Sequence, residues 1–277
     1  MGTMDKGDSR SAKQKVERAA DQAEDHPALT TLARGGFIVM GVLHIIIGWI
    51  AVRIATGSGG SGDEASNSGA LATIAEAPGG QFILWVAVIA LAALGLWQLS
   101  RLLAGDDLKE RCTGVALAVV YFSLAVTTST FARGRSTSDG ETATDVTATV
   151  LAHPWGVVLV IVAGVVVVGA GVYNIWKGAT RGFRKDLEAG AGSGQVGTAI
   201  VVAGTAGYIT RGIAFGILGV LIVIAGWAHD PEQAAGLDAA LRTLGEQPFG
   251  SVLLIIVGIG LLLFGVYSIA RARYVRM

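Results

Sequence analysis

The sequence predicts an all-α integral membrane protein: six transmembrane helices that form three parallel two-helix repeats with pseudo-threefold symmetry. Two observations predict this fold class, namely six long uncharged apolar stretches and a motif that recurs three times. The 277-residue chain is 52% hydrophobic and only 15% charged, whereas an average soluble domain carries about 25% charge. This composition excludes a disordered chain, a coiled coil and a nucleic-acid-binding protein, because their surfaces need charge.

Six stretches without Asp, Glu, Lys or Arg are long enough to cross a bilayer, which takes a helix of about 20 residues. They are continuously apolar rather than alternating, which favours helices over the strands of a β-barrel. One such stretch is compatible with a buried helix of a soluble protein, but six in one chain favour a membrane protein. The stretches are residues 35–52, 81–100, 112–132, 155–176, 212–229 and 249–270.

Two further segments are not expected to span the membrane. Residues 189–210 are uncharged but interrupted by glycines, so we expect a linker and a short surface helix that leads into the fifth span. Residues 1–27 carry interleaved acidic and basic side chains and lack the apolar core of a signal peptide. We expect them to form a charged cytoplasmic segment.

The distribution of basic residues predicts the orientation. Only four of the 21 Lys and Arg residues, Arg53, Arg133, Arg135 and Arg242, lie on the side opposite the termini, which leaves 17 on the terminal side or just inside the membrane there. Cytoplasmic loops of membrane proteins carry an excess of Lys and Arg. Both termini are therefore expected in the cytoplasm.

The second, fourth and sixth spans share one motif. The pattern P-x-G-x14-G-x-[WY]-[QNS]-[LI]-x-[RK] begins at Pro78, Pro154 and Pro248 without a gap. A helix-like phrase precedes each proline, at residues 70–74, 147–150 and 240–244, and predicts a short surface helix followed by a turn into the span. Parallel repeats are related by an axis along the membrane normal. The predicted units cover residues 28–105, 106–187 and 195–275.

The odd spans repeat more loosely. Gly41, His44 and Gly48 of the first span align with Gly212, Phe215 and Gly219 of the fifth, and with Ala118, Tyr121 and Ala125 of the third. We assign the glycines to close helix packing within the chain.

At these residues the chain resembles the bacterial membrane-protein family called domain of unknown function 1206. The resemblance rests on the openings G-[YF]-x-x-[RM]-G at Gly36 and Gly207 and on the phrase A-L-x-x-[IL]-x-x-x-P-x-G at Ala70 and Ala240. It implies three copies of a two-helix unit and a bacterial plasma-membrane location. It implies no activity, ligand or catalytic residue.

Two ionisable side chains are expected inside the membrane: His44 in the first span, and Arg211, which directly precedes the fifth uncharged stretch. Such groups are costly in lipid and are functional candidates by default. For His44 we favour a hydrogen-bonded structural role over proton transfer, because its counterparts are Tyr121 and Phe215. For Arg211 we favour a side chain that reaches the cytoplasmic headgroups, with a specific lipid or anion contact as the alternative.

A polar trio, Gln98, Asn174 and Ser268, occupies one motif position on the even spans. We favour hydrogen bonding between helices over the lining of a pore or binding site. No Asp or Glu lies in any predicted span, which counts against a carrier coupled to protons or sodium ions.

These observations favour a non-catalytic membrane protein that interacts with partners or organises lipid. The chain has a single cysteine and no recognisable catalytic or nucleotide-binding motif, so we expect no enzymatic activity, cofactor or metal. Membrane lipids are the expected partners, nucleic acid is not, and the outer loops offer a surface to a protein partner. A carrier or pore for a small solute along the pseudo-threefold axis is the alternative. No particular oligomeric state is predicted.

Overall fold

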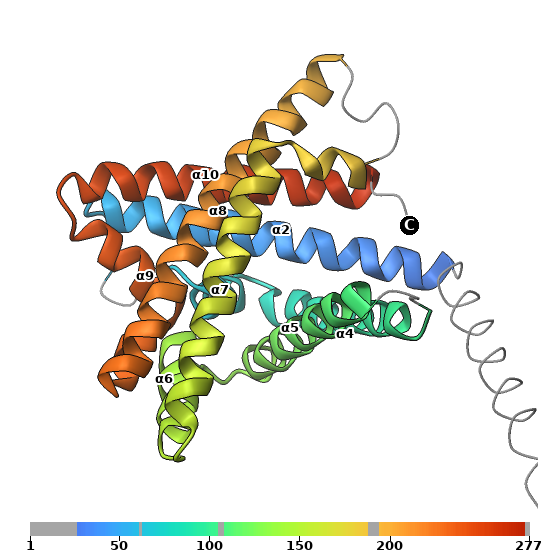
Figure 1. Cartoon of the computed structure of the whole chain (residues 1–277). Coiled ribbons are helices and arrows are strands. Elements are labelled where there is room, and N and C mark those ends of the chain that lie inside the picture. The colour runs from blue at the N-terminus through green and yellow to red at the C-terminus, as the bar shows by residue number, and fades with distance from the viewer. Residues whose placement is uncertain (1–26, 61–62, 105–107, 188–193, 275–277) are drawn as a thin grey trace, which may run out of the picture.

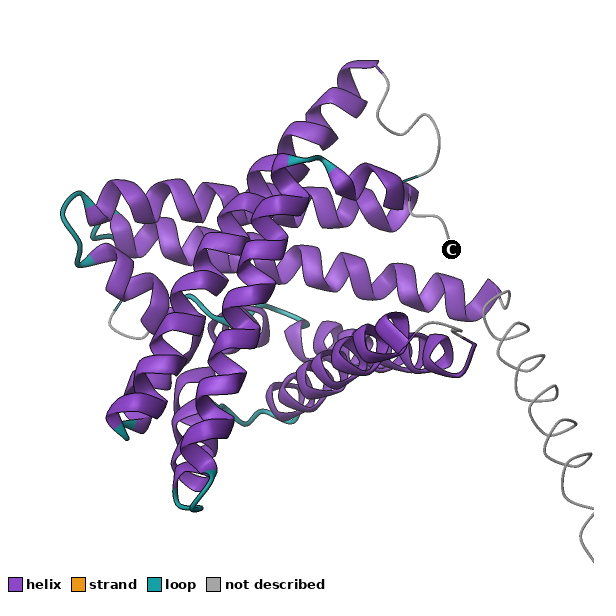
Figure 2. Cartoon of the chain, in the orientation of Figure 1, coloured by secondary structure: helices purple, strands orange, loops and turns teal. Residues whose placement is uncertain are grey.

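The computed structural model describes residues 27–60, 63–104, 108–187 and 194–274, in which the regular elements are helices (Figure 2). The expected cytoplasmic segment lies almost wholly outside these residues. Six helices are long, and shorter helices connect them. The long helices are α2 (Pro27–Ala55), α4 (Gly80–Ala104), α5 (Leu108–Ala132), α7 (Gly156–Ala179), α8 (Gly194–Ala228) and α10 (Gly250–Tyr274).

The short helices are α3 (Asn67–Glu76), α6 (Asp139–Leu151) and α9 (Gly236–Gly245), together with the 3-10 turns η1 (Gly182–Asp186) and η2 (Pro231–Ala234). The chain order places α3, α6 and α9 between the two long helices of each predicted unit, at one end of the bundle. We call this the short-helix end. The three surface helices expected before the prolines are thereby confirmed.

Five of the long helices are long and apolar enough to cross a membrane. These are α2, α4, α7, α8 and α10, so a multi-pass membrane protein is supported. In α5 the apolar stretch is Leu117–Ala132, and several hydroxyl side chains lie within it near the short-helix end. Thr128 donates to the carbonyl of Leu124 at 2.6 Å and Ser129 to that of Val126 at 2.7 Å, so these polar groups are satisfied within the helix.

The prediction of a linker and a separate short helix in residues 189–210 was wrong from Gly194 onward, because α8 is one continuous helix from Gly194 to Ala228. Its glycines lie against neighbouring elements rather than breaking the helix. A Cβ atom on Gly204 would lie 2.7 Å from the Phe183 ring, and one on Gly207 would lie 2.6 Å from the backbone of Phe264. These glycines allow η1 and α10 to approach α8.

The long helices pack most extensively as three pairs, α2 with α10, α4 with α5 and α7 with α8 (Figure 1). Each pair joins helices from different predicted units: the first helix of one unit packs on the second helix of the unit before it, and α2 packs on the last helix, α10. Further contacts join α8 to α10 and α2 to α4. The α5 and α7 helices of the second unit form no comparable interface.

Glycines bring the backbones together in two of these pairs. A Cβ atom on Gly41 would lie 2.7 Å from the Gly265 carbonyl oxygen, and one on Gly48 would lie 2.5 Å from that of Gly258. In the α7–α8 pair, Gly171 meets Gly212 and Gly164 meets Gly219 in the same way, with added Cβ atoms 2.6–2.8 Å from the opposite carbonyl oxygens. These contacts confirm that the glycines serve packing within the chain.

The α4–α5 pair uses side chains instead. Ala118 and Ala125 stand where the other odd helices have glycine, and a Cβ atom on Gly95 of α4 would lie 3.1 Å from the ring of Phe122. The backbones thus approach closely in the α2–α10 and α7–α8 pairs, whereas in the α4–α5 pair the ring of Phe122 packs against Gly95.

The proline motif forms the same turn three times. The N–H of Gly80 donates to the Ala77 carbonyl at 2.8 Å, that of Gly156 to His153 at 2.9 Å, and that of Gly250 to Gln247 at 2.7 Å. A Cβ atom on any of these glycines would collide with a carbonyl oxygen of the preceding short helix. The motif glycine therefore lets each short helix fold directly back into the next long helix.

We predict that Gly171→Ala lowers the melting temperature of the protein, whereas Gly169→Ala does not. At Gly171 the added methyl group meets the Gly212 carbonyl oxygen at 2.7 Å, but no atom lies within 4 Å of the same position on Gly169. Overpacking of this kind costs about 1–3 kcal/mol, while alanine at an open helical position stabilises a helix by up to about 1 kcal/mol. Thermal unfolding in detergent, followed by circular dichroism, compares the two; equal melting temperatures would contradict the tight α7–α8 contact.

Candidate functional site

Hydrogen bonds join the starts of the short helices to one another, and we call this group of bonds the lock. The backbone N–H of Ala65 donates to Asp238 Oδ1 at 2.8 Å, and Ser68 donates to Asp139 from its hydroxyl at 2.7 Å and its N–H at 3.2 Å. Ser138 Oγ donates to Glu64 Oε1 at 3.3 Å. Each bond joins residues from two different predicted units, so the short-helix end ties all three units together.

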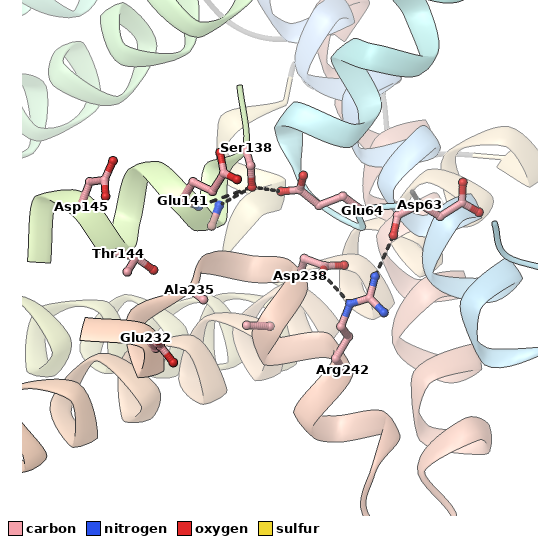
Figure 3. Close-up of a pocket in the computed structure, with 12 residues that line it drawn as sticks. Asp63, Glu64, Ser138, Glu141, Thr144, Asp145, Glu232, Ala235, Asp238 and Arg242 are labelled. Carbon is pink, nitrogen blue, oxygen red and sulfur yellow. Dashed lines mark hydrogen bonds and ion pairs between the residues drawn. The ribbon is translucent and has the colours of Figure 1, made fainter. Parts of the chain in front are cut away.

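A cavity of about 530 Å³ opens beside this lock (Figure 3). Its lining comes from all three predicted units, and half of its twelve residues are acidic: Asp63, Glu64, Ser138, Gly140, Glu141, Thr144, Asp145, Glu232, Ala235, Asp238, Ala239 and Arg242. Arg242 pairs with Asp238 at 2.6 Å and donates to the carbonyl of Asp63 at 2.7 Å. Within the described residues, no group of three or more His, Cys, Asp or Glu side chains is arranged to hold a metal ion.

Glu64 is the most constrained carboxyl group of this cavity. Burial raises its pKa above the ordinary value of 4.5, and the charges of Asp139 and Asp238 act in the same direction. Hydrogen bonds from Ser66 and Ser138 oppose the shift. Because the folded protein binds this proton more tightly than the unfolded chain, ionisation of Glu64 reduces the free energy of unfolding.

We predict that the melting temperature of Glu64→Gln rises relative to wild type as the pH increases from about 4 to about 8. The cost of the Glu64 charge is absent below its ordinary pKa and complete above its folded pKa, whereas the amide carries no charge and keeps an oxygen acceptor for Ser66 and Ser138. Thermal unfolding across this pH range measures the difference. Glu246→Gln, at an exposed position, controls for the loss of one charge; a difference independent of pH would contradict the prediction.

At the other side of the bundle, Arg211 lies deep in the helix packing. Arg211 directly precedes Gly212, the residue at which α8 meets Gly171 of α7. Gly171 lies 15 residues from the start of α7, which places this contact about 22 Å along the helix from the short-helix end. Its guanidinium lies over the rings of Phe215 at 4.9 Å and Phe264 at 4.7 Å. Its Nε is buried without a hydrogen-bond partner.

The aromatic contacts compensate only part of the cost of this buried charge. A cation over an aromatic face is worth about 0.5–2 kcal/mol, whereas the effective cost of burying an ion is several kcal/mol. No acidic side chain lies within the predicted spans. Arg211 is therefore a cation without an anionic partner among the described residues.

His44 lies beside the same ring. It is 7% exposed, its ring centroid is 4.8 Å from that of Phe264, and its Nδ1 lies 2.8 Å from the Met40 carbonyl oxygen. Because a carbonyl oxygen only accepts, Nδ1 carries the hydrogen of this bond. The two intramembrane ionisable residues thus meet around Phe264 of α10, one from α2 and one from α8.

Two members of the polar trio form hydrogen bonds within their own helices. Asn174 donates from Nδ2 to the Ala170 carbonyl at 2.7 Å, and Ser268 donates from its hydroxyl to the Phe264 carbonyl at 2.9 Å. Gln98 is 5% exposed. For Asn174 and Ser268 the observed bonds are to their own helix. A joint role of the trio as interhelical contact or pore lining stays a prediction.

Phe264 was missed by the sequence reasoning. It centres an aromatic group in which its ring lies 5.3 Å from Tyr208 and 6.1 Å from Tyr267, while Phe183 stacks on Tyr208 at 5.4 Å. One signal was available: Leu94 and Ala170 occupy the corresponding position, directly before the motif glycine, in the other units. An aromatic residue in only one of three repeats marks a position with a distinct environment.

Comparison with known proteins identifies the family. The family described as Domain of Unknown Function (DUF1206) matches residues 35–101, 113–181 and 206–275, which is more than half of the chain. The chain belongs to this family. Its three matches confirm the internal repeat. The chain is also similar to the uncharacterized protein YxxB of Bacillus subtilis (strain 168), with 29% identity over 263 residues that cover 92% of this chain and 94% of that protein. No solved structure matches the chain.

Proposed function

We propose that this DUF1206 protein is a non-catalytic, six-span protein of the bacterial plasma membrane that binds and organises lipid. In this proposal α5 is the sixth span, with its hydroxyl groups satisfied by its own backbone. The cyclic pairing of each odd helix with the even helix of the preceding unit supports a pseudo-threefold arrangement, because the same rule generates all three pairs. The units are not equivalent in detail, since α5 and α7 lack the contact that α2–α4 and α8–α10 make.

The charges of the described residues support cytoplasmic termini. Acidic side chains line the short-helix end, whereas Arg34, Lys177, Arg271 and Arg273 lie toward the opposite ends of the long helices. The positive-inside rule assigns the latter end to the cytoplasm. The short-helix end, with its acidic cavity, then faces outward and offers a surface to a protein partner.

The lock between α3, α6 and α9 is the observation that carries the choice of lipid binding over solute transport. Bonds from Ala65, Ser68 and Ser138 to carboxylates of other units hold the three units together where a channel would open outward. The long helices meanwhile present large apolar side chains to their surroundings, including Val119, Val126, Val166 and Phe82, each more than 60% exposed. Such faces suit contact with lipid chains.

A carrier for a small anion is the second candidate, favoured by Arg211. A buried cation at membrane depth is a common mark of a substrate path. Proton or sodium coupling is disfavoured by the lack of acidic residues in the spans. We expect neither enzymatic activity nor a cofactor in either case, and no binding of nucleic acid.

We predict that the protein gathers anionic lipid around itself and passes no solute. The exposed tryptophans, Trp49, Trp85, Trp155, Trp176 and Trp227, are donors for energy transfer to pyrene-labelled lipids in vesicles. Transfer to labelled phosphatidylglycerol is expected to exceed transfer to labelled phosphatidylcholine, and the release of entrapped phosphate to equal that of protein-free vesicles.

Equal transfer to both lipids would overturn lipid organisation. Solute flux that is lost when Gln98, Asn174 and Ser268 are changed to Leu would establish the carrier or pore instead. The orientation is tested by cysteines introduced at the exposed positions Lys185 and Gln247, in a Cys112→Ser background. A membrane-impermeant maleimide added to intact cells is expected to label position 247 only, and labelling of both positions would contradict the topology.

A further inference from the structure

We infer that Arg211 is the centre of a binding site for one phosphate-bearing anion, set among α8, α10 and α2 on the cytoplasmic side of the bundle. The inference rests on the proposed membrane role and names the chemistry that the protein would recognise. The group that binds is either the headgroup of an anionic lipid or free phosphate.

The guanidinium of Arg211 has a hydrogen-bond donor without an acceptor. Phe215 and Phe264 supply aromatic faces at 4.9 and 4.7 Å, but neither ring accepts a strong hydrogen bond. The Nε atom is buried without a partner, although the side chain as a whole remains partly exposed. A buried donor of this kind normally has an acceptor.

The charged groups around Arg211 are basic. Arg271 lies close enough to interact electrostatically with Arg211, and so does His44, whereas no carboxylate among the described residues does. Arg271 also lies 4.7 Å from the ring of Phe37, which places a second guanidinium on the same side of the bundle. Two cations held near each other in an apolar surrounding repel, and an anion between them relieves that repulsion.

Tyrosines are the remaining polar groups near Arg211. The ring of Tyr208 of α8 lies 5.3 Å from the same Phe264 ring, and Tyr208 and Tyr121 of α5 are both among the groups that act on Arg211 electrostatically. Phenol hydroxyls are hydrogen-bond donors. The planar guanidinium offers two parallel N–H groups to a phosphate. Guanidinium and phenol donors without a carboxylate suit a phosphate, and basic sites between helices on the cytoplasmic side of membrane proteins bind lipid headgroups.

The helix arrangement leaves a side from which a lipid can approach. Tyr121 is carried by α5, which packs on α4 but forms no comparable interface with α7 or α8. The third helix pair therefore does not close over Arg211 as α10 does. A headgroup from the inner leaflet can approach laterally between the α4–α5 and α7–α8 pairs, and free phosphate can approach from the cytoplasm.

Native mass spectrometry tests whether the bound anion is a lipid headgroup. The purified full chain is taken from vesicles of phosphatidylcholine and phosphatidylglycerol, and the lipid that it retains is identified. Wild type is expected to retain one phosphatidylglycerol, and Arg211→Gln to retain it at least about tenfold less, as the loss of a charge-assisted contact predicts. Arg273→Gln removes the same charge from an exposed position on α10 and is expected to behave as wild type. Arg211→Lys, which keeps the charge, is expected to fall between wild type and Arg211→Gln.

Calorimetric titration of inorganic phosphate into lipid-free protein in an uncharged detergent tests whether the site binds free phosphate. Saturable binding that Arg211→Gln abolishes supports free phosphate as the ligand, and an Arg211-dependent lipid with no phosphate binding supports the headgroup. If Arg211→Gln fails to fold, Arg211→Lys takes its place: weaker retention of phosphatidylglycerol than in wild type supports the site, and retention equal to wild type overturns it.

The inference is also overturned if Arg211→Gln and Arg273→Gln lower the retention of phosphatidylglycerol to the same extent, or if wild type binds neither phosphatidylglycerol nor phosphate. In those cases preferential energy transfer to phosphatidylglycerol leaves the proposed lipid role intact, so the two failures are distinguishable. Phosphate flux into vesicles that depends on Arg211 would support the anion site and overturn lipid organisation as the function.

Discussion

The close approach of helix backbones at paired glycines is the constraint on which the bundle depends. Between apolar helices in lipid there is little hydrophobic gain from association, so packing and weak polar contacts must hold the helices together. Glycines seven residues apart on α2 and α10, and again on α7 and α8, face one another backbone to backbone. Because each pair joins two different units, these contacts turn three hairpins into one body.

The same pairing explains what the sequence could and could not predict. Spacing along the chain predicted six spans, of which five are helices long and apolar enough to cross a membrane, together with the short helices before the prolines and the turn at Gly80, Gly156 and Gly250. These features depend on local residues. Gly197 was misread as a break in the chain, although it is buried inside α8, because a glycine that opens a turn and one that serves helix packing look alike in sequence. The structure shows the second role at Gly204, which lies against the ring of Phe183.

The neighbourhood of Arg211 was beyond prediction for a related reason. His44, Arg211 and Phe264 lie on α2, α8 and α10, and the first of these helices belongs to a different unit from the other two. Knowing the repeat predicts equivalent positions but not which unit packs on which, and it is the cyclic pairing that brings α2 onto α10. The sequence therefore identified both ionisable residues, while their shared aromatic neighbour emerged only from the packing.

The threefold repeat determines the arrangement of the helices, whereas the ionisable residues occur at positions where the three units differ. At the position of Arg211 the other units have Met40 and Leu117, and at that of His44 they have Tyr121 and Phe215. A charge in all three copies would place three cations together in an apolar bundle at a high electrostatic cost. One arginine with differing neighbours instead makes a single asymmetric site, while no carboxylate lies within a predicted span and those of the short-helix end tie the units together. This separation of charge leaves Arg211 to find its counterion outside the chain.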